Sequence, residues 1–219
     1  TGGFSAPPYY LNMSFSVGDD EENVKKNRLL FYNVIKIDRH RIAQPKQIHS
    51  DTVKIADNPG YYDDCDALVT NKKELFLSIS VADCVPIFLF DSVNKVIAAI
   101  HSGWQGSEKR ILTKTVESMK NNYYCKSHNI FAHIGYSAGS CCYEVGSEVA
   151  QKFDKSFLRT KSDSKFFLDL KEYNKFLLLE TGIPENQIEV SPFCTICNPS
   201  FLHSYRRDGN RSGRMIGVI

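Results

Sequence analysis

One stretch of sequence constrains the fold of this chain more than any other. Residues 86–90 read PIFLF and residues 95–100 read KVIAAI, so two short apolar segments flank the polar turn at 91–94. A continuous apolar run of this length is typical of a strand that is buried on both faces. The two segments therefore predict a buried β-hairpin.

Hydrophobic periodicity and turn residues outline the rest of the chain. They predict helices at 19–37, 107–120, 146–153 and 171–181, and further strands at 46–56, 66–70, 75–81, 130–135, 187–190 and 215–219. Strands and helices are mixed without strict alternation. This pattern favours an α+β fold with mixed sheets over a doubly wound parallel sheet.

Composition excludes several functional classes. The chain has 219 residues, with 42% apolar and 24% charged residues and a formal net charge of +2. These are ordinary values for a globular protein, so they exclude disordered, collagen-like and coiled-coil classes. We expect a single domain over residues 1–219. The absence of long basic runs argues against nucleic acid as a partner. No apolar segment has the length of a membrane span or the pattern of a signal peptide, so we expect a cytoplasmic protein without a membrane partner. Monomer is the default expectation.

The seven cysteines have no regular spacing. This is too sparse for a disulfide scaffold and indicates a reducing compartment, in which one or two thiols serve chemistry. Cys84 lies before the first strand of the hairpin and His101 at the end of the second. His49, in a third strand pattern, is a further candidate. From spacing alone, the more common interpretation is that Cys84 is a buried small residue and each histidine a hydrogen-bonded structural or surface residue.

If these three side chains converge, they form a set of ligands for zinc that leaves the fourth position open. An open position is typical of catalytic rather than structural zinc. A water held there would lose a proton near neutral pH and become a nucleophile.

Five motifs occur in an order that resembles the YfiH family, also known as the laccase-domain or polyphenol-oxidase family. They are Gln47-Ile48-His49-Ser50, Ala82-Asp83-Cys84-Val85-Pro86, His101-Ser102-Gly103-Trp104-Gln105-Gly106, Cys142-Tyr143-Glu144-Val145-Gly146 and Tyr205-Arg206-Arg207-Asp208-Gly209. The resemblance covers essentially the whole chain. It implies a four-layer α/β/β/α sandwich of mixed sheets and a metal site made by His49, Cys84 and His101.

Two departures from the family pattern bear on function. Gln105 stands where the family usually has Arg, which puts a phosphate-binding role at that position in doubt. The family also has a strand and a Thr-Arg pair before Gly2-Gly3, so we expect the sequence from Thr1 onwards to lack the first strand.

Several other residues have both a structural and a functional interpretation. Arg206 and Arg207 form either a solvated, ion-paired loop or a site for an anion or ribose. Glu144 is either a helix N-terminal acid or a proton-transfer carboxylate. Asp83 could orient a metal-bound histidine.

The remaining cysteines and histidines carry weaker signals. Cys194 and Cys197 form a Cys-x-x-Cys motif, for which Cys141-Cys142 is a poor second ligand pair because adjacent side chains rarely converge on one ion. We therefore interpret these thiols as incidental or weakly redox-active. Cys65 and Cys125 carry no signal, and His40, His128, His133 and His203 are expected to be structural or solvated.

Four functions follow from these residues and the resemblance. The first is a zinc-dependent enzyme that phosphorolyses adenosine, inosine and methylthioadenosine and deaminates adenosine, with nucleoside and phosphate as its partners. The second is a hydrolase that edits a peptidoglycan precursor, with Cys84 as the alternative nucleophile and His101 as its base. A copper-dependent polyphenol oxidase and a non-catalytic zinc-stabilised module are the third and fourth.

Overall fold

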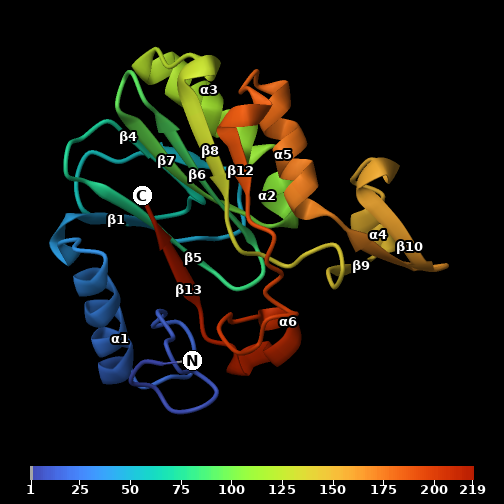
Figure 1. Cartoon of the computed structure of the whole chain (residues 1–219), viewed down its shortest axis with the longest axis horizontal. Coiled ribbons are helices and arrows are strands. Elements are labelled where there is room, and N and C mark those ends of the chain that lie inside the picture. Colours follow the sequence, from blue (N-terminus) through green and yellow to red (C-terminus); the bar gives the residue numbers. More distant parts are fainter. Residues whose placement is uncertain (1) are drawn as a thin grey trace.

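A computed structural model of the chain describes residues 2–219 (Figure 1). Thr1, where the expectation of a missing first strand applies, lies outside the described residues. The centre of the molecule is a six-stranded sheet with the order β12-β8-β6-β7-β4-β2. Its strands are β2 (Val53–Ile55), β4 (Ala67–Thr70), β6 (Val85–Asp91), β7 (Val96–Ser102), β8 (Ile130–Ile134) and β12 (Ile188–Val190).

The predicted hairpin is confirmed as the antiparallel pair β6 and β7 in the middle of this sheet. Ile87 lies opposite Ile100, and Val85 lies opposite Ser102. The sheet is mixed, because β6 pairs antiparallel with β8 while β12 runs parallel to β8. Both central strands are almost entirely buried, which explains their continuous apolar sequences.

A second sheet packs against the first. It has the order β13-β5-β1-β3, with β1 (Ile42–Pro45), β3 (Gly60–Tyr62), β5 (Phe76–Val81) and β13 (Met215–Val218). Strand β5 contacts β7, and β1 contacts β4. A core of small and branched apolar side chains, among them Ala43, Leu77, Ile79, Leu68 and Ala99, fills the space between the sheets.

Helices cover the two outer faces. On the six-stranded sheet lie α3 (Ile111–Tyr123), which contacts β7 and β4, and α5 (Leu170–Glu180), which contacts β8 and β12. On the other side α1 (Glu21–Val34) joins the four-stranded sheet where Arg28 donates a hydrogen bond to Gln44 on β1. The predicted α+β sandwich with mixed sheets is confirmed. Within residues 2–219, every helix is too short or too polar to cross a membrane.

A small third sheet projects from one end of the molecule (Figure 1). It has the order β10-β11-β9, with β9 (Glu144–Gly146), β10 (Leu158–Ser162) and β11 (Lys165–Leu168). The sequence does not predict it, because β10 is polar and mostly exposed. The helix predicted at 146–153 is only the single turn α4 (Ser147–Ala150).

Three other predictions are wrong in detail. Of the strand predicted at 46–56, only Val53–Ile55 is a strand (β2); the preceding residues 46–52 form a loop between β1 and β2, and His49 lies in that loop with a left-handed φ of 60°. The helix predicted at 107–120 is interrupted at Arg110, which also has a positive φ, and divides into α2 (Trp104–Glu108) and α3. The Arg206–Asp208 segment, predicted as a loop, lies in the short helix α6 (Tyr205–Asp208).

Candidate functional site

Three of the predicted site residues meet at one end of the central hairpin. His101 lies opposite Pro86 in the β6–β7 register, so Cys84, just before β6, faces the residues that follow β7. The 46–52 loop brings His49 to the same point. The nitrogen and sulfur donor atoms of the three residues all lie within 4.8 Å of one another. That they hold a metal ion remains a prediction.

Asp66 organises this cluster, and the sequence does not single it out. The N–H at Nδ1 of His101 donates to Asp66 Oδ1 at 2.7 Å, which leaves Nε2 free to act as a ligand. The same carboxylate accepts backbone N–H bonds from Ile48 and His49 at 3.1 Å and from Ser50 at 2.7 Å. Asp66 thus orients one histidine ring and holds the loop that carries the other.

Asp83, the residue predicted to orient a histidine, does not do so. Its carboxylate accepts the Thr195 hydroxyl and, at 2.6 Å, the backbone N–H of Arg206. The orienting residue is Asp66 because it directly precedes β4, the antiparallel neighbour of β7 (Ala67 lies opposite Ile100). This pairing between distant segments cannot be read from a short motif.

The charges of the cluster favour an ionised thiol. Burial opposes the charged form of Cys84, yet His101 and His49 together lower its pKa to about 6. Burial likewise opposes a charged His101, but the Cys84 thiolate and Asp66 raise its pKa to about 9. For Asp66, burial is outweighed by His101 and Ser50, and its pKa falls to about 2. The thiolate is the form of cysteine that binds metals and attacks electrophiles.

The donor set fits a metal ion of the zinc type. Two imidazole nitrogens and a thiolate, with a carboxylate behind one histidine, are the usual protein environment of an open zinc site. Gly103 provides the space: a Cβ at this position would lie 3.1 Å from both Cys84 Sγ and His49 Nδ1. Thiolate and imidazole also suit copper, so the donors alone do not select between the two metals.

The three residues line a cavity of about 880 Å³, which is also bordered by residues of β1, β5, β13 and α6. This volume lies within the range of small-molecule sites. The cavity also presents four aromatic side chains, Phe15, Tyr61, Tyr143 and Tyr205, and four cationic ones, Arg28, Lys46, Arg206 and Arg214. Burial raises the pKa of Tyr143, so its hydroxyl remains protonated.

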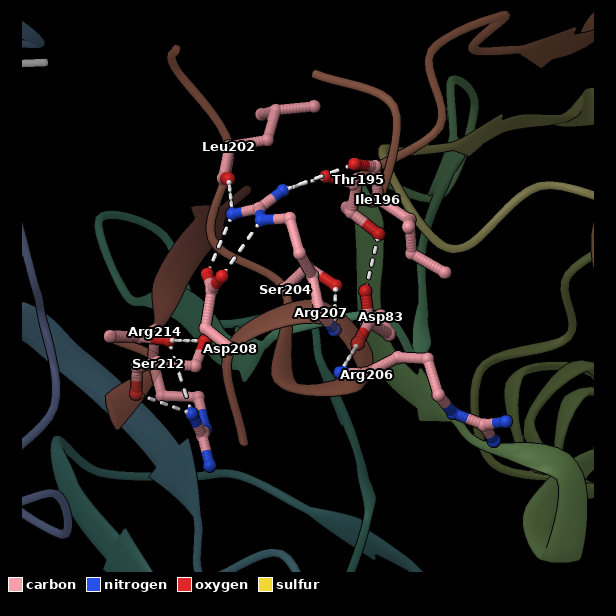
Figure 2. A network of polar contacts seen from close by, with 11 residues as sticks. Asp83, Thr195, Ile196, Leu202, Ser204, Arg206, Arg207, Asp208, Ser212 and Arg214 are labelled. Carbon is pink, nitrogen blue, oxygen red and sulfur yellow. Dashed lines mark hydrogen bonds and ion pairs between the residues drawn. The ribbon is translucent and has the colours of Figure 1, made fainter. Parts of the chain in front are cut away.

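The two neighbouring arginines of the fifth motif have different roles. Arg207 is locked into the protein: it donates to the carbonyls of Thr195 and Leu202 at 2.8 and 2.9 Å and pairs with Asp208 at 2.7 Å. Figure 2 shows this network, with the Arg206 side chain directed away from it. Arg206 lines the cavity and its guanidinium lies over the Tyr143 ring. The anion-binding interpretation therefore applies to Arg206 alone.

Glu144 and Gln105 lie outside the cavity lining. Glu144 is on β9 rather than at a helix N-terminus, and it pairs with Lys161 and Lys165. Lys161 holds the pKa of Glu144 below its usual range. Gln105 is exposed on α2. The cationic side chains that line the cavity come from other positions. The loss of a phosphate-binding role at position 105 stays a prediction.

The other histidines do not join the cluster. Among residues 2–219, His40, His128, His133 and His203 lie in neither group of possible metal ligands. The seven cysteines are all free thiols, and Cys65 and Cys125 are buried. Apart from Cys84, the other four cysteines form a second group, which corrects the expectation that Cys141 and Cys142 make a poor partner for the Cys-x-x-Cys motif.

With this geometry established, comparisons with known proteins define the class. The whole chain, residues 1–219, matches the family model for multi-copper polyphenol oxidoreductase laccase, and the chain belongs to that family. Purine nucleoside phosphorylase YlmD of Bacillus subtilis is 31% identical over 236 residues, spanning 100% of this chain and 84% of that relative.

Two further comparisons agree with this assignment. Adenosine deaminase RL5, from an unknown prokaryotic organism, is 32% identical over 225 residues, spanning 93% of this chain and 84% of that relative. The crystal structure of the Bacillus licheniformis hypothetical protein YfiH matches with a TM-score of 0.95 at 33% identity, covering 100% of this chain and 88% of that one. The family resemblance seen in the motifs is confirmed.

Proposed function

We propose that this chain is a zinc-dependent enzyme of purine nucleosides, which phosphorolyses adenosine, inosine and methylthioadenosine and deaminates adenosine. One observation carries the proposal: an open set of three metal ligands lies in the same cavity as aromatic rings and arginines. Aromatic faces suit a purine base, and guanidinium groups suit phosphate. The names of the relatives YlmD and RL5 support both activities.

His49, Cys84 and His101 are the residues that would hold the ion. A bound zinc would supply Lewis acidity and activate water near neutral pH. The protein itself positions the ligands. Asp66 holds His101 in the tautomer that is protonated at Nδ1, and Gly103 leaves room for the ligand atoms.

Deamination requires attack of water on C6 of adenine and departure of the amino group as ammonia. Tyr143 borders the cavity with a protonated hydroxyl, so it can donate a hydrogen bond to the base. The ring faces of Tyr61 and Phe15 offer stacking surfaces that hold a purine in the cavity. These contacts would orient C6 toward the centre of His49, Cys84 and His101.

Phosphorolysis requires attack of a phosphate oxygen on C1′ of the ribose while the bond from C1′ to N9 breaks. The phosphate dianion must be held close to the sugar. Arg206 and Arg214 line the same cavity, and Arg214 is anchored by its bonds to the Ser212 and Gly213 carbonyls. Anchored guanidiniums bind phosphate with charge-assisted hydrogen bonds and little entropy cost.

The test is product analysis with adenosine, with and without phosphate. We expect adenine and ribose 1-phosphate only when phosphate is present, and inosine in either case. Cys84→Ser should reduce both products to background, whereas Cys125→Ala, which alters a buried thiol elsewhere, should retain them. Undiminished product formation by Cys84→Ser would disprove the proposed mechanism.

A second candidate rests on a specific contact. Cys84 Sγ interacts with both His101 and His49, as in a thiolate–imidazole nucleophile pair. The pair could attack an amide, such as the bond cleaved in editing a peptidoglycan precursor, with the amine leaving and water releasing the acyl group. Activity that is blocked by iodoacetamide but survives chelation would favour this reaction.

Two less favoured functions make distinct predictions. A multicopper oxidase needs many histidines, roughly ten in our estimate for that enzyme class. In residues 2–219 only His49 and His101 belong to a possible metal group. Turnover of phenols on copper loading would support that role. A non-catalytic zinc module would bind metal without any turnover.

A further inference from the structure

Four cysteines from two loops gather outside the nucleoside cavity. Cys141 and Cys142 precede β9, and Cys194 and Cys197 follow β12. Their sulfur atoms all lie within 4.8 Å of one another, with Cys142 Sγ 3.2 Å and Cys141 Sγ 3.5 Å from Cys197 Sγ. None of the four lines the cavity described above.

The fold explains how these distant segments meet. Strands β8 and β12 are parallel neighbours, so the loops that follow them leave the sheet at the same end of the strands. The loops are joined where the Thr195 N–H donates to the Ser137 carbonyl at 3.0 Å. Cys142 and Tyr143 both donate backbone N–H bonds to Gly139, and this tight turn aims both adjacent thiols at Cys197.

The spacing of the sulfurs matches a metal ion better than a disulfide. Four sulfurs bound at about 2.3 Å around a tetrahedral ion lie about 3.8 Å apart. A disulfide requires about 2 Å, and all four thiols are free. Tetrahedral sites of four thiolates are typical of structural zinc.

The surroundings of Cys194 independently favour a thiolate. Gly139 donates its N–H to Cys194 Sγ at 3.2 Å, and the N–H groups of Ile196 and Cys197 donate to the same sulfur. Backbone N–H groups directed at a cysteine sulfur stabilise its charged, metal-binding form.

Two further features suit an anionic metal cluster. The buried ammonium of Lys171 donates to the Ser191 and Phe193 carbonyls at 2.8 and 3.0 Å, and it lies near Cys194 and Cys141. A zinc ion with four thiolates carries two negative charges, which a nearby cation stabilises. A Cβ at Gly139 would lie 3.1 Å from Cys194 Cβ and 3.3 Å from Cys141 Sγ, so glycine preserves the space.

We propose that Cys141, Cys142, Cys194 and Cys197 bind a structural zinc ion that is separate from the His49, Cys84 and His101 centre. The ion closes its coordination with protein ligands and has no position for substrate. This proposal does not rest on the nucleoside activity.

The second zinc ion would clamp two loops that form part of the cavity wall. Tyr143 directly follows Cys142 and lines the cavity. Thr195, within the Cys-x-x-Cys motif, donates to Asp83, the neighbour of Cys84 (Figure 2). The clamp therefore positions one wall of the nucleoside cavity without taking part in its chemistry.

The test counts zinc in protein purified under reducing conditions without added metal. We expect about two zinc ions per chain for the wild type and about one for Cys84→Ser, in which the four-thiolate site persists. Adding Cys194→Ser to Cys84→Ser should remove the remaining zinc, whereas adding Cys125→Ala should not. Nucleoside turnover is not measured, so the proposal fails or stands separately from the proposed function.

A second measurement covers the case in which the variants that carry Cys194→Ser do not fold. Cobalt bound to the folded Cys84→Ser protein should show the strong visible and near-ultraviolet bands of tetrahedral thiolate coordination. A mercurial titration of the zinc-loaded Cys84→Ser protein should release its zinc as the four clustered thiols react. Absence of metal from Cys84→Ser, iron in place of zinc, or a disulfide among the four cysteines would overturn the proposal.

Discussion

The two groups of thiols in this protein differ in what surrounds the sulfur atoms. Cys84 faces two histidines in a cavity of about 880 Å³, whereas Cys194 faces three other cysteines and backbone N–H groups. A centre with three protein ligands keeps a position for substrate, and a centre with four does not. The difference suggests that one centre performs chemistry and the other holds the loops around it.

Brief chelation offers the sharpest way to separate the two centres. We expect a chelator to remove metal first from the open His49, Cys84 and His101 centre, and nucleoside turnover to fall to background. The melting temperature should fall by less than about 3 °C, because the closed centre still joins the two loops. Zinc added back should restore turnover. Turnover that declines only in step with unfolding would remove the distinction between the centres.

Replacement of Asp66 tests how the open centre is prepared. Asp66→Asn retains the size of the side chain but removes the charge that orients His101 and accepts the N–H bonds of the 48–50 loop. Loss of a carboxylate behind a metal-binding histidine typically costs 10–100-fold in metal affinity or activity, so we expect about that loss. Metal affinity measured by competition with a coloured chelator checks it.

The control for that variant is Asp83→Asn, because Asp83 bonds to Thr195 and Arg206 and not to a histidine. It should bind metal with nearly unchanged affinity. Equal losses of affinity in the two variants would contradict the assigned role of Asp66.

Replacement of Arg206 tests the cationic side of the cavity. Arg206→Ala should raise the KM for phosphate by about 10-fold or more, because a charge-assisted hydrogen bond contributes roughly 1.5–3 kcal/mol. Gln105→Ala should leave this KM unchanged, since Gln105 does not line the cavity. Initial rates at varied phosphate concentrations provide the measurement. A larger rise in the KM for phosphate with Gln105→Ala than with Arg206→Ala would assign phosphate binding to position 105 instead.

The smallest expected effect is at Gly103. Gly103→Ala places a methyl group 3.1 Å from Cys84 Sγ and His49 Nδ1, so both ligands must move by a few tenths of an ångström. We expect a loss in turnover of less than about 10-fold with the fold retained, because larger displacements near 1 Å cost about 100-fold. Gly2→Ala, at a site without close neighbours, is the matched control.

Local patterns account for the parts of the structure that were predicted correctly. The apolar runs of β6 and β7 identify the central hairpin, since each segment carries its own signal. The motifs place His49, Cys84 and His101 at one site by resemblance to a family, and the structure brings their donor atoms together.

Two of the missed features depend on contacts between distant segments. Asp66 reaches His101 only because β4 pairs with β7, and neither segment indicates that pairing. The four cysteines meet because β8 and β12 are parallel neighbours and a turn at Gly139 redirects two adjacent side chains. The exposed strand β10 has a polar sequence that resembles a loop.

The most direct test is an anomalous difference map, collected at the zinc absorption edge from crystals of protein purified without added metal. The account predicts two peaks per chain: one bounded by His49, Cys84 and His101 with a side open to the cavity, and one enclosed by the four cysteines. A map without a peak beside Cys84, recorded from protein that turns over adenosine, would contradict it.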